Sequence, residues 1–423
     1  MALALAALGL FLAAIGTPIF ALLAGAALVL FHSAGIDLSA AIIEFSRLAD
    51  MPALIAIPLF TFAGYLLAES RAPQRMVKIA RALFGWLPGG VAIAGLCACA
   101  LFTAFTGASG VTIIALGGII YPMLRKQGYP ESFCLGLVTT TGSLGLLFPP
   151  SLPIIIYALV GKISINRLFA AAAVPGILIL LLLCAYAVFV AIRHKVARVP
   201  FSWREAASAV REGAWEIPLP FLVIGGIYGG LFTASEASAV MAFYVLLVEV
   251  FVYRDIRLQD LPGVVRRSMV LVGAILIVLG TALGLTSYLV DAQAPMRLFA
   301  IISSRLSHAW QFLICLNIFL LVVNMIEIFS AIIIVVPVIL PVALGYRINP
   351  LHLGALFLLN LEIGYLTMPM GLNLFLSSRR FERPMGELYR ATFPFWIILL
   401  LGLAAVTYVP ALSLWLPRTL GIR

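Results

Sequence analysis

Charged side chains are scarce in this sequence. Asp, Glu, Lys and Arg make up 10% of its 423 residues, whereas 63% are hydrophobic, and the mean hydropathy is +1.15. A typical water-soluble domain carries about 25% charged residues. The composition therefore excludes an ordinary soluble domain and favours an all-α polytopic protein that crosses a membrane many times.

Residue patterns for catalysis and metal binding are also lacking. The sequence has no Walker motif, no glycine-rich nucleotide loop and no Ser-His-Asp arrangement. Five cysteines lie within apolar runs, where we interpret them as small packing residues. Four histidines lie in loops or at span ends and show no ligand spacing: His32, His194, His308 and His352. The sequence thus predicts neither an enzyme nor a cofactor.

Apolar runs long enough to cross a membrane recur from end to end. About 20 residues of helix cross a bilayer core. The N-terminal run lacks the basic region of a cleavable signal peptide and continues into a second apolar run, so we expect spans from the start. About ten spans are predicted, at residues 2–16, 18–32, 51–69, 132–158, 168–193, 215–232, 235–253, 268–290, 351–378 and 391–416.

The basic residues fall in short loops, which indicates membrane orientation rather than nucleic-acid binding despite a net charge of +10. We place the loop from Arg71 to Arg81 in the cytoplasm. This puts 19 of the 27 Lys and Arg residues on that side, as the positive-inside rule requires. Both termini then lie outside, and residues 194–214 form a cytoplasmic linker.

Two further segments, 89–124 and 309–345, are too long for one span and are interrupted near the middle. TGASG (106–110) separates two apolar arms in the first, and NMIEIFS (324–330) takes the same place in the second. Each arm is too short to cross, so we predict two re-entrant hairpins whose tips stop near the midplane. The alternative is one kinked spanning helix for each segment.

The chain contains an internal repeat. ESRAPQRM (69–76) resembles DAQAPMRL (291–298) at an offset of 222, and Pro122, Gly145 and Pro150 match Pro341, Gly364 and Pro369 at an offset of 219. Each half has an odd number of predicted crossings, so residues 1–193 and 215–416 would form two inverted repeats. Inverted repeats are typical of secondary transporters.

The segments TTTGSLGLLFPPSLP (139–153) and LNLEIGYLTMPMGLN (359–373) are predicted to be corresponding broken spans. Their prolines lack the N–H of a continuous helix, and unwound backbone at membrane depth has to be buried or line a cavity. Freed carbonyls suit Na⁺, and half-helix N-termini suit an anion. Hydroxyls that could complete such sites belong to Thr106, Ser109, Thr141, Ser143 and Thr367. The alternative is that each hydroxyl bonds back to its own helix.

Three carboxylates need separate interpretation. Glu327 lies at the second hairpin tip, and Glu362 lies one turn before the second break. An ionisable group at that depth costs at least about 2.5 kcal/mol unless paired, so such residues usually serve ions or protons. The alternative is a structural pair with a basic residue or a snorkelling position. We interpret Glu249 as an interfacial group, with Arg254 close by in sequence.

With these features the chain resembles the large membrane subunit of the tripartite ATP-independent periplasmic (TRAP) transporters. The resemblance covers nearly the whole chain and implies a sodium-coupled importer of organic acids in the bacterial inner membrane. It also implies an elevator motion of a transport domain within a scaffold, a small four-helix membrane subunit and a periplasmic substrate-binding protein as partners. The motifs that carry it are MPALIAIPLFTFAGYLLAES (51–70), LPGGVAIAGLCACALFTAFTGASG (87–110), GSLGLLFPPSLPIIIYA (142–158), FTASEASAVMAFY (232–244) and LNLEIGYLTMPMGLNLFLSS (359–378).

The resemblance also implies site residues. A first sodium site would use Thr106, Ala108, Thr141, Leu144 and Leu146, a second would use Thr367, Met370 and Gly371, and the substrate would contact Ser109, Ser143, Glu327 and Asn373. The chain departs from the family where Leu146 and Met368 replace prolines and where Glu327 replaces an aspartate. Two other interpretations stay open: a stand-alone sodium/divalent-anion symporter and a non-transporting membrane assembly protein.

Overall fold

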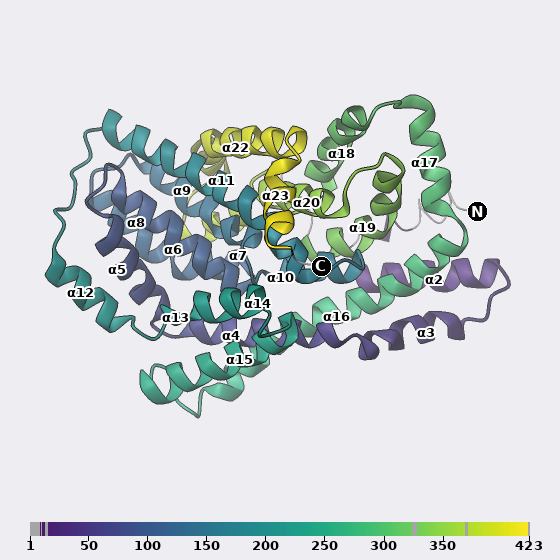
Figure 1. The fold of residues 1–423 in the computed structure, drawn as a ribbon, viewed down its shortest axis with the longest axis horizontal. Coiled ribbons are helices and arrows are strands. Elements are labelled where there is room, and N and C mark those ends of the chain that lie inside the picture. The colour runs from purple at the N-terminus through teal and green to yellow at the C-terminus, as the bar shows by residue number, and fades with distance from the viewer. Residues whose placement is uncertain (1–8, 10, 13–15, 324–327, 369–370, 422–423) are drawn as a thin grey trace.

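A computed structural model describes residues 9, 11–12, 16–323, 328–368 and 371–421. Every regular element in these ranges is helical (Figure 1). Most of the predicted span 2–16 lies outside the described residues, as do Glu327, Pro369 and Met370. The chain is therefore described from the second predicted span onward.

The first half runs from α2 to α11. Its helices are α2 (Ile19–Ser33), α3 (Ser39–Ser46), α4 (Ala56–Glu69), α5 (Ala72–Phe84), α6 (Gly90–Thr106), α7 (Ser109–Ala115), α8 (Gly117–Lys126), α9 (Glu131–Leu144), α10 (Leu152–Val160) and α11 (Ile165–Arg193). Short 3₁₀ turns cover Arg47–Asp50, Pro52–Ile55 and Gly145–Leu147.

The second half follows a linker that contains one helix, α12 (Trp203–Glu212). α13 (Pro218–Pro220) and α14 (Gly226–Tyr228) are joined through a π-helical segment, and a second π-helical segment extends α15 (Ala234–Leu246) to Val252. The remaining helices are α16 (Leu261–Asp291), α17 (Ala294–Arg305), α18 (Ala309–Val323), α19 (Ile328–Gly345), α20 (Pro350–Gly364), α21 (Leu372–Phe381), α22 (Met385–Tyr408) and α23 (Ala411–Thr419).

The length and apolarity of the helices fit a polytopic membrane protein. Six helical stretches in the described ranges can cross a membrane, or eight if each of two bent pairs counts as one span. The predicted spans 18–32 and 215–232 correspond to shorter apolar helices, Ile19–Ser33 and Pro218–Tyr228. The predicted run 391–416 is divided, because α22 ends at Tyr408 and α23 begins at Ala411. The count of ten spans stays a prediction.

The helices form three groups: one along a long edge of the molecule and one at each end (Figure 1). In Figure 1, α2, α3, α4, α15 and α16 lie along one edge of the molecule, and α4 and α16 pack against each other and against their neighbours. The helices α5–α9 gather at one end, and α17–α19 at the other. Helices from both halves are in contact, since α21 packs against α7 and α9.

The two halves share one order of elements. α5 begins at Ala72-Pro73 and α17 begins at Ala294-Pro295. The later matches of the repeat also fall at equivalent places: Pro122 and Pro341 lie inside α8 and α19, Gly145 directly follows α9, and Gly364 is the last residue of α20. The matched positions therefore fall at comparable points of the helices, and the repeat stays a prediction.

A buried ion-pair cluster ties α5 to the end of α15. The Arg75 side chain is 6% exposed and pairs with Glu216, with Glu249 at 3.0 Å and with Asp255 at 2.6 Å. Its guanidinium carbon lies 3.8 Å from the centroid of the Tyr253 ring. Burial alone would lower the pKa of Arg75, but the hydrogen bond to Asp255 and the charges of Glu249 and Glu216 raise it above its ordinary value. Arg75 therefore stays charged and holds three acids from a distant part of the chain.

This cluster corrects the interpretation of Glu249. Glu249 is not an interfacial group beside Arg254, because its side chain is completely buried and both of its oxygens accept from Arg75 Nη2. The two residues are 174 positions apart in sequence. Sequence neighbours of Glu249 therefore carried no information about its partner.

Replacement of Arg75 tests the cluster. In Arg75→Gln three acids lose their counter-charge, and we expect a loss of about 3–5 kcal/mol in stability, because removal of one partner strands buried charge. Thermal unfolding in detergent should show a clearly lower Tm. The matched control is Arg267→Gln, whose pair with Glu69 is largely exposed and should contribute little. An equal Tm change in the two variants would contradict the account.

Candidate functional site

The tip of the first hairpin is built on a tight turn. α6 ends at Thr106, Gly107 has a left-handed φ of 63°, and α7 starts at Ser109. A side chain at Gly107 would also collide with Leu152 of α10, since a Cβ there would lie 2.7 Å from Leu152 Cγ. The two arms lie side by side, with Thr103 Oγ1 2.7 Å from Thr112 Oγ1. This turn brings the tip against the first break.

The first break lies between α9 and α10. α9 with its 3₁₀ turn and α10 are bent by 44° to each other, around a stretch that contains Pro149 and Pro150. A Cβ on Gly142 would lie 3.3 Å from Ser109 O and 2.5 Å from Ile113 Cγ1, so the α9 backbone closely approaches the hairpin. Thr103 Oγ1 donates to Gly142 O at 3.1 Å. The hairpin thus satisfies a carbonyl of the interrupted span.

The start of α21 brings the second half to the same place. Asn373 Nδ2 donates to Thr139 O at 3.2 Å and to Ser143 Oγ at 3.1 Å. One helical turn further on, Ser377 Oγ lies 2.9 Å from Thr139 Oγ1. These contacts join residues more than 200 positions apart. Three elements therefore converge: the first hairpin tip, the first break and the N-terminal turn of α21.

Several buried oxygens on the converging elements have no hydrogen-bond partner within the described residues. They are Thr106 Oγ1, Thr140 Oγ1, Ser151 Oγ and Asn373 Oδ1. Buried polar atoms in folded proteins are normally paired, so these oxygens are free to bind an ion, a solute or a water. Neutral hydroxyl and amide oxygens can bind a hard monovalent cation or accept hydrogen bonds. The place where these elements converge is therefore a candidate ion and solute site.

The structure brings most of the predicted site residues together. Ala108 is half-buried, and the others are buried: Thr106, Ser109, Thr141, Ser143, Leu144, Leu146 and Asn373. The Thr141 hydroxyl lies 3.4 Å from Val138 O, and the Ser143 hydroxyl 3.4 Å from Thr140 O, so both also bond weakly within α9. Thr140 and Ser151 were not predicted, although both lie in the quoted stretch 139–153.

The second break contributes fewer predicted residues to the candidate site. Thr367 is half-buried, and its hydroxyl donates to Ile363 O at 2.8 Å and accepts from Trp396 Nε1 at 3.2 Å. For this residue the alternative of a bond back to its own helix is what the structure shows. Gly371 is buried and closely approaches the backbone carbonyl of Tyr365, whereas Met370 and Glu327 lie outside the described residues.

Buried polar residues lie in α20, in the turns that precede the second break. Asn360 Nδ2 donates to Asn317 Oδ1 at 2.9 Å, and Asn317 Nδ2 donates to Thr407 Oγ1 at 3.0 Å. Glu362 is completely buried, and neither of its oxygens has a partner in the part of the chain that is described. Within the described ranges Glu362 thus shows neither a structural ion pair nor a snorkelling position, and its role stays a prediction.

His352 lies at the start of α20, at a span end as predicted. It is buried there, with its Nδ1 2.7 Å from Ser413 Oγ of α23. Asn349 caps α20 three residues earlier. Among the described residues, no group of three or more His, Cys, Asp or Glu side chains could hold a metal ion.

Comparisons with known proteins give a consistent result. A family model described as "Tripartite ATP-independent periplasmic transporter, DctM component" matches residues 4–412. The C4-dicarboxylate TRAP transporter large permease protein DctM of Pseudomonas aeruginosa is 37% identical over 402 residues, which cover 95% of this chain and 94% of that protein. The ectoine/5-hydroxyectoine TRAP transporter large permease protein UehC of Ruegeria pomeroyi is 33% identical, and the match covers 86% of this chain and 85% of that protein.

A solved structure shares the fold. The YdaH transporter of Alcanivorax borkumensis aligns with a TM-score of 0.62 over 90% of this chain and 88% of that chain, at 14% sequence identity. At this identity the likeness concerns the arrangement of helices alone.

Proposed function

The chain belongs to the DctM component family of the tripartite ATP-independent periplasmic transporters, and we propose that it is the translocation subunit of a sodium-coupled importer of organic acids. As a member of this family it is a multi-pass membrane permease of bacteria and not an enzyme. The observation that carries the sodium assignment is the set of buried neutral oxygens, without a partner among the described residues, on the elements that converge at the first hairpin tip.

The helix ends around these oxygens support cation binding. α6 ends at Thr106 and α9 ends at Leu144, so the negative ends of two helix dipoles point toward one region. Helix C-termini and unwound carbonyls at membrane depth are typical ligands of coupling ions. We propose that the first sodium site uses Thr106, Ala108, Thr141, Leu144 and Leu146, chiefly through backbone carbonyls and the two hydroxyls.

The second sodium site, at Thr367, Met370 and Gly371, is proposed from the family resemblance. The Thr367 hydroxyl already has two partners, so a cation there would rely on backbone carbonyls of the second break. Glu362 lies one turn before that break and has no partner among the residues that the structure describes. A buried carboxylate of this kind favours the approach of a cation.

The substrate is proposed to bind between the two halves, at Ser109, Ser143, Glu327 and Asn373. α21 begins at Leu372, and its N-terminal end carries positive dipole character that suits the carboxylate of an organic acid. Asn373 and Ser143 are already in contact at 3.1 Å, so one ligand group could reach both. The names of the relatives, C4-dicarboxylate and ectoine permeases, support small carboxylated solutes as the substrate class.

The proposed motion is that of an elevator. Residues 1–193 and 215–416 would form two inverted repeats joined by the linker 194–214. The hairpins 89–124 and 309–345 and the broken spans 132–158 and 351–378 would form the moving transport domain. The common helix order of the halves supports the repeat, and the edge formed by α2, α3, α4, α15 and α16 supports a separate scaffold. The small four-helix subunit and the periplasmic binding protein are the proposed partners.

The sodium dependence of uptake tests the proposal at a single hydroxyl. Thr106→Val should raise the Na⁺ concentration for half-maximal uptake by roughly five- to thirtyfold, because one hydroxyl ligand contributes about 1–2 kcal/mol. The measurement is substrate uptake into proteoliposomes at varied Na⁺, constant pH and constant voltage. Thr61→Val is the matched control, since the buried Thr61 hydroxyl donates to Ile57 O at 2.6 Å within its own helix.

Removal of the Na⁺ gradient should abolish uptake by the wild-type protein and by Thr61→Val. Undiminished uptake driven by a proton gradient alone would refute sodium coupling and would assign Glu362 to proton transfer instead.

A second experiment tests the partners. Proteoliposomes that contain this chain and the small subunit should take up little free substrate, and addition of the periplasmic binding protein loaded with substrate should restore transport. The reason is that the binding protein supplies the affinity for dilute substrate. Full, saturable uptake of free substrate without either partner would identify a stand-alone symporter.

A further inference from the structure

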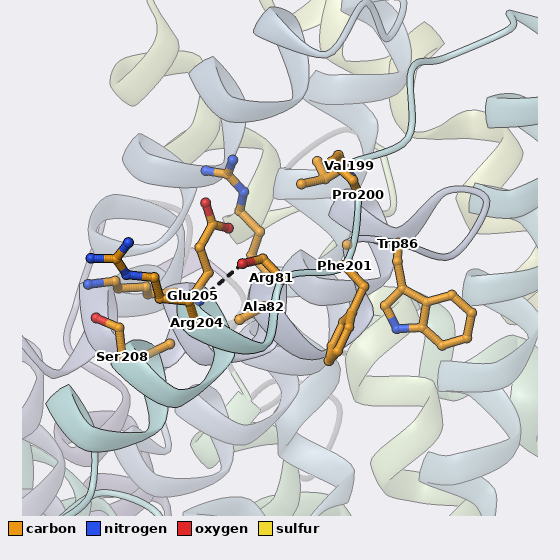
Figure 2. A pocket seen from close by; sticks show the side chains of 13 residues that line it. Arg81, Ala82, Trp86, Val199, Pro200, Phe201, Arg204, Glu205 and Ser208 are labelled. Atoms are coloured by element: carbon orange, nitrogen blue, oxygen red, sulfur yellow. Dashed lines mark hydrogen bonds between the residues drawn. The ribbon is translucent and has the colours of Figure 1, made fainter.

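A surface pocket with a volume of about 550 Å³ lies apart from the candidate transport site, between α5, α12 and the part of the linker that precedes α12 (Figure 2). The linker is fixed there because Val199 N donates to Gly85 O at 3.3 Å. Ser202 caps α12, accepting at 3.4 Å from Glu205 N. The pocket is therefore formed by segments more than 100 residues apart that are held by backbone contacts.

The two ends of the pocket differ in chemistry. Figure 2 shows the guanidinium groups of Arg81 and Arg204 at one end and the rings of Trp86 and Phe201 at the other. Trp86 is 49% exposed and Phe201 is 42% exposed, and Trp203 beside them is 81% exposed. Exposed aromatic rings next to basic side chains are typical of the membrane–water interface.

The charge of the pocket suits a single anion. Lys78 is already paired with Glu212, whereas Arg81 and Arg204 form no ion pair with any residue in the described ranges. Glu205 is a carboxylate in the lining, so two free guanidinium groups against one carboxylate leave a net charge of +1. A phosphodiester carries one negative charge, and guanidinium groups bind phosphate through paired hydrogen bonds.

We propose that this pocket binds the phosphodiester headgroup of an anionic membrane lipid. Arg81 and Arg204 hold the phosphate, and Trp86 and Phe201 contact the glycerol and the first methylene groups. The lipid belongs to the cytoplasmic leaflet, because the loop from Arg71 to Arg81 and the linker 194–214 are both on the predicted positive-inside face. A free phosphate would use the arginines but would leave the exposed rings without a role.

Retention of lipid by the purified protein tests the site. The protein is equilibrated in detergent with equal amounts of phosphatidylglycerol and phosphatidylcholine, and bound lipid is counted by native mass spectrometry. The double variant Arg81→Gln with Arg204→Gln should retain on the order of tenfold less phosphatidylglycerol, because each arginine near a lipid headgroup contributes measurably to binding. Retention of phosphatidylcholine should not change.

The matched control is Lys195→Gln with Arg198→Gln, which removes the same charge from exposed positions of the same linker outside the pocket. This control should retain phosphatidylglycerol as the wild-type protein does. Equal retention by the two double variants would overturn the proposal, since binding would then follow net charge alone or another surface.

Two further measurements separate a lipid from a soluble phosphate. Millimolar inorganic phosphate should not displace phosphatidylglycerol, and Trp86→Ala, which keeps both arginines, should reduce its retention. Displacement by inorganic phosphate would overturn the lipid assignment. Unchanged retention in Trp86→Ala would likewise overturn it, because the aromatic end would have no part in binding.

Discussion

The rest of this structure depends on one constraint: a backbone in hydrocarbon cannot leave its polar groups unpaired. α9 stops at Leu144 and α20 stops at Gly364, so the interrupted segments have to be enclosed by protein. The hairpin supplies Thr103 to the Gly142 carbonyl, and the second half supplies Asn373 to the Thr139 carbonyl. The candidate site arises because side chains of one segment hydrogen-bond to the backbone of another.

Charge is kept away from the proposed first sodium site. The unpaired oxygens beside the first hairpin tip belong to neutral hydroxyl and amide groups, whereas Arg75 and its three acids lie at the junction of α5 with α15. A neutral oxygen cage suits an ion that has to bind and then leave, because conduction and transport need moderate affinity. The buried ion pairs suit a fixed joint, since their rupture would strand charge. The two kinds of polar contact therefore match the proposed division into moving domain and scaffold.

Much of this arrangement could be predicted from local chemistry, and the failures share one cause. Pro149 and Pro150 predicted the break between α9 and α10, because the effect of proline on the backbone acts within a few residues. The partner of Glu249 is 174 residues away, and the Ser413 that contacts His352 belongs to another helix. Periodicity carries no such information. Thr367 was predicted as a sodium ligand, but its hydroxyl already donates to Ile363 O and accepts from Trp396 Nε1. The sequence motif did not reveal these two partners.

The central claim is that the two hairpin tips approach the midplane from opposite faces of the membrane. The most direct test is the accessibility of cysteines at Ser109 and Ser330 to a membrane-impermeant maleimide, in a background that lacks the five native cysteines. Cysteines at the exposed Ser208 and Ser307 calibrate the cytoplasmic and periplasmic sides. The account predicts labelling of Ser109→Cys from the cytoplasm and of Ser330→Cys from the periplasm, with both reactions slowed by Na⁺. Reaction of both tips from the same side would contradict the inverted repeat and the transport site derived from it.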